Sequence, residues 1–249
     1  MNSPALVINS HSSNSDCLAI FFSQLEKHVD VGFFSNIYLL VDACENIPQY
    51  STCIKYDPEK CFTDQMIGCL SQVTEKYLLY SNEDYLFYGN SKPEVLSELI
   101  EIIEEGNLSY TRFVYTDIEK LPPFHNIEEG TLLYISSFAS NCYSQTLSLW
   151  KTEDLLEIHE KGPKASIGER GNLEGHFEIL ARDTVKDLNI QGLVVFGDDP
   201  KRGLYHYDSS IFPHIASALV RGRWNVSEYP ELEKILAENR IDTTIRGVV

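Results

Sequence analysis

The segment KYLLYSNEDYLFYG, residues 76–89, places two adjacent carboxylates, Glu83 and Asp84, directly after a run of aromatic and aliphatic residues. The run over 76–81 has the pattern of a buried β-strand, so the two acidic residues fall where that strand ends. An exposed turn between two strands is the simpler interpretation of such a pair. The elements around the segment indicate whether it is a turn or part of a site.

The chain before this segment alternates strand and helix signals. Residues 5–9 (ALVIN) and 36–42 (NIYLLVD) read as strands, and they flank a helix over 12–29 that opens with Ser, Asn and Asp. A second helix is expected over 62–73, just before the strand at 76–81. This order implies parallel strands joined by right-handed crossovers. We therefore predict an α/β fold with a mostly parallel sheet flanked by helices and a Rossmann-like nucleotide-binding front half.

The remainder of the chain is less regular. No internal repeat or low-complexity linker divides it, so we expect one domain over 1–249, with a nucleotide-binding half (1–110) and a more variable half (111–249). A Gly-rich segment over 161–176 has the composition of a lid or of a plain surface loop. Further helices are predicted over 91–106, 152–162, 176–188 and 227–240, and further strands over 112–117, 131–137, 144–150 and 192–197.

Composition narrows the class of protein. The 37 acidic and 20 basic residues give a formal charge of −17. That charge repels a polyphosphate backbone unless cations cluster, and no Lys/Arg run occurs, so no nucleic-acid partner is expected. No apolar run approaches the ~20 residues of a membrane span, and the first residues lack a basic leader. We expect a cytoplasmic protein without a transmembrane segment.

The cysteines show neither a CxxC pair nor metal-finger spacing with histidine. A reducing compartment suits them, and we expect small buried apolar side chains rather than a nucleophile. They are Cys17, Cys44, Cys53, Cys61, Cys69 and Cys142.

Polar residues follow three of the predicted strands. Asn9, Ser10 and His11 end the first, Asp42 ends the second, and the acidic pair ends the third. Because ligands of a parallel α/β sheet bind at the carboxyl ends of its strands, these groups should gather at one edge. Adjacent buried carboxylates repel each other unless a cation offsets them, and their hard oxygen atoms suit Mg²⁺ or Mn²⁺.

Phosphate-binding loops of other classes are missing from the sequence. It has no GxGxxG after the first strand, no GxxxxGK[ST] and no GxSxG elbow. A dinucleotide oxidoreductase and a P-loop ATPase are therefore not supported. The ligand that remains is a nucleotide diphosphate whose phosphate charge is neutralised by a metal ion.

Several segments occur in a characteristic order: VINSHSSNSDCLAIFFSQLEKH, NIYLLVD, FTDQMIGCLSQVTEKYLLYSNEDYLFYG, SQTLSLWKTEDLLEI, GHFEI and GRWN. This order resembles a group of GT-A-type glycosyltransferases found in bacteria and large viruses, and it spans most of the chain. In that group a strand ends in an acidic pair followed by an aromatic residue, which plays the part of the DxD motif. The sequence Asn82-Glu83-Asp84 departs from the DxD form because Glu stands next to Asp.

The resemblance implies a glycosyltransferase with a nucleotide-sugar donor in the front half and a glycan or other hydroxyl acceptor in the back half. It implies that Asp84 binds Mn²⁺ or Mg²⁺ and that Glu83 assists. It also implies that Asn9, Ser10 and His11 line the base and ribose pocket.

Two further donor contacts follow from the same resemblance. Asp42 is expected to accept hydrogen bonds from the base or ribose, and Gln65 to reach the nucleoside or sugar. Each has a structural alternative: Asp42 can be a loop cap and Gln65 a surface residue.

Glu178 in GHFEIL is the candidate catalytic base. An inverting transfer needs a carboxylate to take the proton of the acceptor hydroxyl, whereas a retaining enzyme does not need one there. Glu178 falls in the first turn of a predicted helix, where the helix dipole favours its ionised form. The family it resembles carries an acidic residue at the corresponding position. A simple helix cap is the alternative, and Glu174 or Asp183 lies close enough to substitute.

Other residues of the back half carry weaker indications. His206 is a possible third metal ligand or phosphate contact, although a histidine between two tyrosines is often structural. Trp150 is either a sugar-stacking platform or a core residue. The basic residues expected nearest the cleft, one or two of which could neutralise the departing diphosphate, are Lys164, Arg170, Arg182 and Lys201.

Two other functions remain open. A sugar-phosphate nucleotidyltransferase would open with a Gly-rich, cationic loop after the first strand, and NSHSSNSD supplies neither glycine nor cation. A catalytically silent relative that only binds sugars or proteins would fit the irregular acidic motif.

Overall fold

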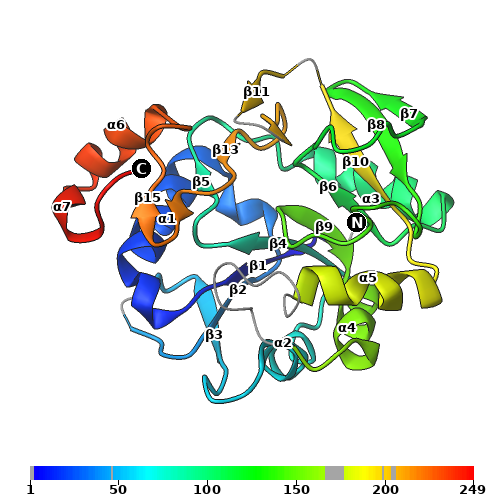
Figure 1. Ribbon diagram of the computed structural model, residues 1–249, viewed down its shortest axis with the longest axis horizontal. Helices are drawn as coiled ribbons and strands as arrows, with labels where there is room; N and C mark the ends of the chain where they lie inside the picture. The colour runs from blue at the N-terminus through cyan, green and yellow to red at the C-terminus, as the bar shows by residue number, and fades with distance from the viewer. Residues whose placement is uncertain (1–2, 46, 166–176, 198, 203–205) are drawn as a thin grey trace.

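A nine-stranded sheet forms the centre of the computed structural model, which describes residues 3–45, 47–165, 177–197, 199–202 and 206–249. The strand order is β3-β2-β1-β4-β9-β6-β10-β8-β7 (Figure 1). The strands are β1 (Ala5–Asn9), β2 (Ile37–Val41), β3 (Ser51–Lys55), β4 (Tyr77–Asn82), β6 (Tyr110–Arg112), β7 (Pro123–Ile127), β8 (Gly130–Ile135), β9 (Ser148–Lys151) and β10 (Gly192–Phe196).

Most of these strands run in one direction. The pairs β3-β2, β2-β1, β1-β4 and β6-β10 are parallel, whereas β9 and β8 run antiparallel to both of their neighbours. Removing these two reversed strands from the nine leaves seven that share a direction. The predicted α/β fold with a mostly parallel sheet is therefore confirmed.

Helices cover both faces of the sheet because successive strand residues point to opposite sides. In β1, Leu6 and Ile8 belong to the hydrophobic cluster that α1, α3 and α6 complete. Ala5 and Val7 belong to the opposite cluster, completed by α2, α4 and α5. These helices are α1 (Ser15–His28), α2 (Phe62–Leu70), α3 (Val95–Glu105), α4 (Thr152–Lys161), α5 (Phe177–Asp187) and α6 (Glu231–Glu238).

Short elements complete the chain. The two-stranded ladders pair β5 with β13, β11 with β12, and β14 with β15, and the last helix α7 lies beside α6 at the left of Figure 1. No described helix has the length and apolar character needed to cross a bilayer. The remaining bounds are β5 (Leu86–Phe87), β11 (Lys201–Arg202), β12 (His206–Tyr207), β13 (His214–Ile215), β14 (Leu219–Val220), β15 (Arg223–Trp224), α7 (Thr243–Arg246), and the 3-10 turns Ser12–Asn14 and Val31–Phe33.

The structure differs from the sequence-based expectation at two places near β2. Strand β3 was not predicted; it is an edge strand whose residues Ser51 to Lys55 are mostly polar and only partly buried. Cys44 and Cys53 form a disulfide that joins β3 to the loop after β2, so the expectation of six reduced cysteines is wrong. Cys17, Cys69 and Cys142 are free and buried, as expected of small apolar side chains.

Trp150 is a core residue. It is 1% exposed, and its ring stacks on that of Tyr110 with centroids 4.3 Å apart. The Tyr110 hydroxyl donates a 2.7 Å hydrogen bond to the Cys142 carbonyl, so the buried ring is fixed at both ends. The Tyr110 ring also lies against Gly192, the residue of β10 that pairs with Tyr110 in the sheet. The interpretation of Trp150 as a sugar platform is therefore wrong.

We expect Gly192→Ala to destabilise the protein by about 1–3 kcal/mol, because a Cβ at this position would lie 2.5 Å from the Tyr110 ring carbons Cε1 and Cε2. Gly68→Ala is the matched control: a Cβ there meets nothing within 4 Å, and alanine in helix α2 should stabilise by about 0.5–1 kcal/mol. Urea unfolding curves of both variants test this. Equal stability of the two would contradict the packing argument.

Candidate functional site

A cavity of about 480 Å³ opens at the carboxyl ends of β1 and β4. Its position agrees with the general location of ligand sites in parallel α/β sheets. Six of the predicted site residues line it: Asn9, Ser10, His11, Gln65, Glu83 and Asp84. The other lining residues are Asn14, Tyr56, Pro58, Lys60, Phe62, Asn82, Gln145 and Leu219. We call this cavity the first pocket.

The sheet itself brings two of these strand ends together. Asn9 lies opposite Asn82 in the β1–β4 register, and its Nδ2 atom donates to Oδ1 of Asn82 at 3.4 Å. The Glu83 amide then donates to the Asn9 carbonyl at 3.2 Å. Parallel pairing therefore continues past the strands and fixes the backbone of the acidic pair beside Asn9.

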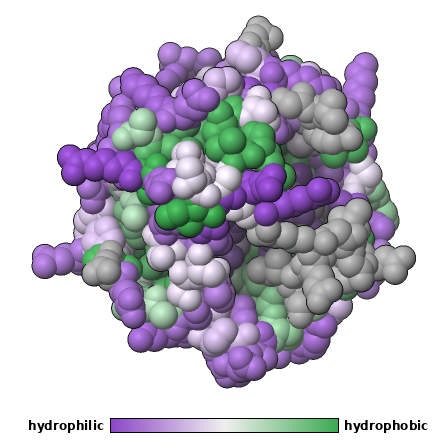
Figure 2. All heavy atoms as spheres, turned by 60° about the vertical axis from the view of Figure 1, so that its left-hand side comes forward, coloured by the Kyte–Doolittle hydropathy of each residue, from purple (hydrophilic) through white to green (hydrophobic). Residues whose placement is uncertain are grey.

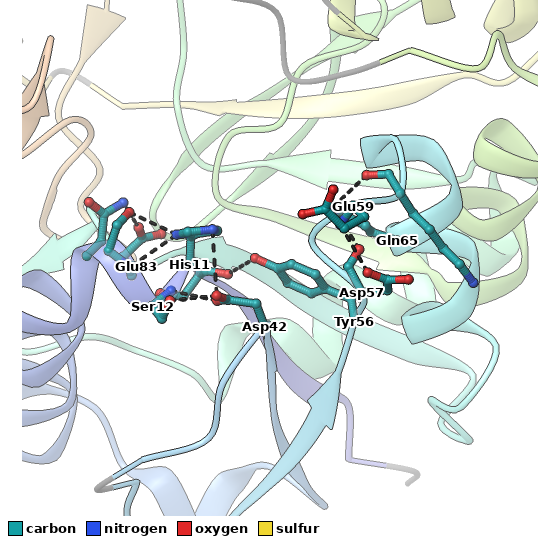
Figure 3. Close-up of polar contacts among 12 residues, drawn as sticks. His11, Ser12, Asp42, Tyr56, Asp57, Glu59, Gln65 and Glu83 are labelled. Atoms are coloured by element: carbon teal, nitrogen blue, oxygen red, sulfur yellow. Dashed lines mark hydrogen bonds and ion pairs between the residues drawn. The ribbon is translucent and has the colours of Figure 1, made fainter.

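Asp42 lies at the end of β2 but is not among the residues that line the first pocket. Its carboxylate accepts hydrogen bonds from the Ser12 amide at 2.7 Å and the Ser12 hydroxyl at 2.5 Å, and it lies 3.7 Å from His11 Nε2 (Figure 3). Burial acts to raise the pKa of Asp42, but the bonds from Ser12 outweigh it and hold the pKa below its ordinary value. Asp42 thus anchors the turn that carries His11.

The acidic pair is largely withdrawn from water. Glu83 is 7% exposed and accepts a 2.6 Å hydrogen bond from Asn14 Nδ2, while the Asp84 carbonyl accepts one from the Ala218 amide at 2.9 Å. Burial raises the pKa of Glu83 to about 7. Burial, and then the charge of Glu83, raise the pKa of Asp84 to about 8. The pair resists full ionisation unless a cation approaches it.

These residues fit a divalent cation. Two adjacent carboxyls line one pocket, and their raised pKa values show that the surrounding protein does not neutralise them. No group of three or more His, Cys, Asp or Glu side chains suited to a metal occurs within the described ranges. The protein would therefore supply at most two carboxylate ligands here, and the donor and water the rest.

Glu178 is linked to the acidic motif through Gln145. In the first turn of α5, Glu178 accepts hydrogen bonds from the Gln145 amide at 2.5 Å and the Ser144 hydroxyl at 3.0 Å. The Gln145 carbonyl accepts from Asn82 Nδ2 and the Tyr85 hydroxyl, both at 3.1 Å. A single residue thus joins the candidate base to the strand that carries the acidic pair.

Gln65, Tyr56 and Lys60 form the opposite side of the first pocket. Gln65 Nε2 donates to the Lys60 carbonyl at 2.8 Å, and the Tyr56 hydroxyl donates to the Ser10 carbonyl at 2.6 Å (Figure 3). Lys60 is the one Lys or Arg among the described lining residues. Sequence reasoning missed Tyr56 and Lys60 because it placed no strand at β3, the element that delivers them.

None of the described basic residues that were expected near the cleft lines the first pocket. Lys164 pairs with Asp64, and Lys201 pairs with Asp117 at 2.6 Å. Arg182 does not line the first pocket, and Arg170, Glu174 and the Gly-rich loop with Gly168 and Gly171 fall within 166–176, which lie outside the described residues.

His206 is not brought to Asp84. It lines a second pocket, contacts the Tyr229 hydroxyl and lies 3.6 Å from Glu228. Burial lowers its pKa. The structure therefore does not place the histidine with the carboxyl that it was expected to join.

The C-terminal helix contacts the turn that carries Asn14, a lining residue of the first pocket, which the sequence did not indicate. Arg246 binds both oxygen atoms of Asp16, at 2.5 and 2.6 Å, and donates to the Ser13 carbonyl at 3.0 Å. Its guanidinium lies 3.4 Å from Oδ1 of Asn14, the residue that holds Glu83. Arg246 thus supports Asn14, which lies 232 positions earlier in the sequence and holds the Glu83 carboxylate.

The raised pKa values predict an unusual dependence of stability on pH. Both carboxyls keep their protons to higher pH in the folded chain than in the unfolded chain, where they ionise near pH ~4. Their contribution to stability is complete below that pH and is lost as pH rises through about 7 and about 8. Asp84→Asn, which cannot ionise, should be more stable than the natural protein at pH 9 by at least about 1 kcal/mol, or roughly 2–4 °C in Tm.

Thermal melts without added metal at pH 5 and pH 9 measure this difference. Glu101→Gln, which removes an exposed carboxylate from α3, is the matched control. If Asp84→Asn and Glu101→Gln changed Tm alike at both pH values, the burial argument would be wrong.

Comparison with known proteins gives fold neighbours of low sequence identity. No protein-family model and no curated protein matches the chain. S. aureus TarS 1-349 in complex with UDP aligns with a TM-score of 0.50 at 11% identity, over 98% of this chain and 68% of that chain. Its complex with UDP-GlcNAc gives 0.50 at 12%, over 98% and 69%. The mannosyltransferase PcManGT from Pyrobaculum calidifontis, in complex with GDP-Man and Mn2+, gives 0.49 at 10%, over 82% and 59%. The TarS likeness shows that this chain has the GT-A fold.

Proposed function

We propose that this chain is a glycosyltransferase that moves a sugar from a nucleoside-diphosphate donor to a hydroxyl acceptor by an inverting mechanism. The observation that carries the proposal is the first pocket, where Glu83 and Asp84 meet the ends of β1 and β4 and Gln145 links them to Glu178. The GT-A fold, shared with a protein whose structure is in complex with UDP, agrees with it.

The front half, residues 1–110, takes the donor in this proposal. Asn9, Ser10 and His11 line the side of the first pocket that the base and ribose would occupy, and Gln65 lies across from them. Asp42 acts through Ser12, whose hydroxyl and amide it holds, so it is a positioning residue for His11. Lys60 is the cation placed to meet a phosphate.

A divalent cation, Mn²⁺ or Mg²⁺, would be held by Asp84 with Glu83 beside it. When bound, it would neutralise charge on the diphosphate leaving group. Asn14 holds Glu83 in place through its 2.6 Å hydrogen bond, and Arg246 and Asp16 fix the turn that carries Asn14.

Glu178 is the proposed general base. It takes the proton from the acceptor hydroxyl while that oxygen forms a bond to the anomeric carbon and the bond from this carbon to the diphosphate oxygen breaks. The diphosphate leaves with the electron pair of the broken bond. The hydrogen bonds from Ser144 and Gln145 fix the position of the Glu178 carboxylate.

Donor binding is tested by a thermal-shift panel of UDP-, GDP-, dTDP- and CMP-linked ligands with and without Mn²⁺. A nucleoside diphosphate at about 100-fold its Kd should stabilise the protein by ~2.7 kcal/mol, or roughly 5–10 °C in Tm. Asp84→Asn should lose the Mn²⁺-dependent part of this rise to a greater extent than Glu83→Gln, and Glu101→Gln should keep it. If no ligand in the panel shifted Tm, the proposal of a donor site would be wrong.

The base is tested by Glu178→Gln, which keeps the shape of the side chain but cannot accept the proton. Hydrolysis or transfer from the nucleotide sugar that binds should fall by about 10²–10⁴-fold. The Tm shift with nucleoside diphosphate and Mn²⁺ should not change. Near-normal turnover would exclude Glu178, and donor binding without any turnover in the natural protein would indicate a silent relative.

A further inference from the structure

A second pocket of about 700 Å³ lies next to the first, within the size range of small-molecule sites. It is formed by the segments that follow β6, precede β9 and surround β14 and β15. Its lining residues are Val114, Thr116, Thr146, His206, Ala216, Ser217, Val220, Asn225, Ser227 and Glu228.

The two pockets share a wall beside the acidic pair. Leu219 lines the first pocket and Val220 the second, and the neighbours Gln145 and Thr146 divide in the same way. The Ala218 amide donates to the Asp84 carbonyl at 2.9 Å. The second pocket therefore adjoins the segment that contacts Asp84, the residue proposed to hold the metal.

The lining suits hydrogen bonds to hydroxyl groups. Thr116, Thr146, Ser217 and Ser227 contribute hydroxyls. Ser227 is exposed at the pocket, so its hydroxyl is open to a ligand.

The charge of the second pocket disfavours anions. Glu228 accepts a 3.2 Å hydrogen bond from Asn225, but no Lys or Arg is found among the described lining residues. The nearest ionisable group, His206, has a pKa lowered by burial, so it does not supply a positive charge at neutral pH. A phosphate or carboxylate placed here would meet the Glu228 carboxylate without a compensating cation.

We propose that the second pocket binds the acceptor, and that the acceptor presents an uncharged saccharide rather than a phosphorylated or acidic one. Sugar hydroxyls would pair with Ser227 and Glu228, and a C–H face would lie against Val114 and Val220. This inference rests on the proposed function, because an acceptor presupposes transfer.

The test measures binding without any transfer, by saturation-transfer NMR on the full chain. The neutral probes are methyl β-D-glucopyranoside, methyl α-D-mannopyranoside, lactose and maltose, and the anionic probes are glucose 6-phosphate and glucuronate. We expect at least one neutral probe to bind with a millimolar Kd and the anionic probes to bind at least tenfold more weakly. Glu228→Gln, which can keep the hydrogen bond from Asn225, should reduce that difference to less than threefold.

A steric variant locates the site. Ser227 is exposed at the pocket, so Ser227→Trp should weaken binding of the neutral probe at least tenfold; Ser23→Trp, on the exposed face of α1, is the control and should not. Anionic probes that bind as tightly as neutral ones, no neutral probe that binds, or equal effects of the two tryptophans would overturn the inference. A saccharide that binds in this way while no nucleoside diphosphate shifts Tm would instead overturn the proposed function and leave the ligand class of the pocket standing.

Discussion

Two neighbouring carboxyls at the end of a central strand, Glu83 buried and Asp84 partly buried, are the main constraint on this structure. Strand β4 lies between β1 and β9. Glu83 and Asp84 therefore follow an interior strand of the sheet and not an edge strand. Each ionised carboxylate loses solvation there, and each raises the free energy of the other. Hydrogen bonds to the carboxyls, from Asn14 to Glu83 and from the Leu219 amide and the Ser217 side chain to Asp84, reduce this cost without removing it.

The supports of the acidic pair come from both ends of the chain. The turn before α1 supplies Asn14, and the C-terminal residue Arg246 fixes that turn through Asp16 and Ser13. The position of Asn14 beside Glu83 therefore depends on packing of the end of the chain against its beginning. Figure 2 shows a group of apolar residues among hydrophilic ones on this side of the molecule. Val220, Ile245, Val248 and Val249, near the end of the chain, are exposed.

Local sequence patterns were sufficient for β1, β2, β4, β8 and β10, for helices α1 to α6, and for the gathering of Asn9, Ser10 and His11 near Glu83, but not for β3, β7 or the short strands. Apolar runs such as ALVIN are typical of strands buried on both faces, and the polar residues that end them must meet if the strands are parallel. The edge strand β3 was not predicted because its residues are mostly polar and its position depends on pairing with β2. The contact of Gln145 with Glu178 escaped for a related reason, since it requires β9 to insert beside β4.

Net charge poses a separate difficulty for an anionic donor. At physiological ionic strength, screening over about 8 Å removes most of the effect of distant carboxylates, so the charge of −17 acts mainly through the groups at the pocket. Lys60 is the one lysine or arginine among the described lining residues of the first pocket, and it faces two carboxyls there. One such cation offsets only part of the negative charge that the acidic pair and the proposed diphosphate would bring together, which is why the proposed donor complex includes a divalent cation. The described lining of the second pocket has one carboxylate and neither Lys nor Arg, which suits the uncharged ligand proposed for it.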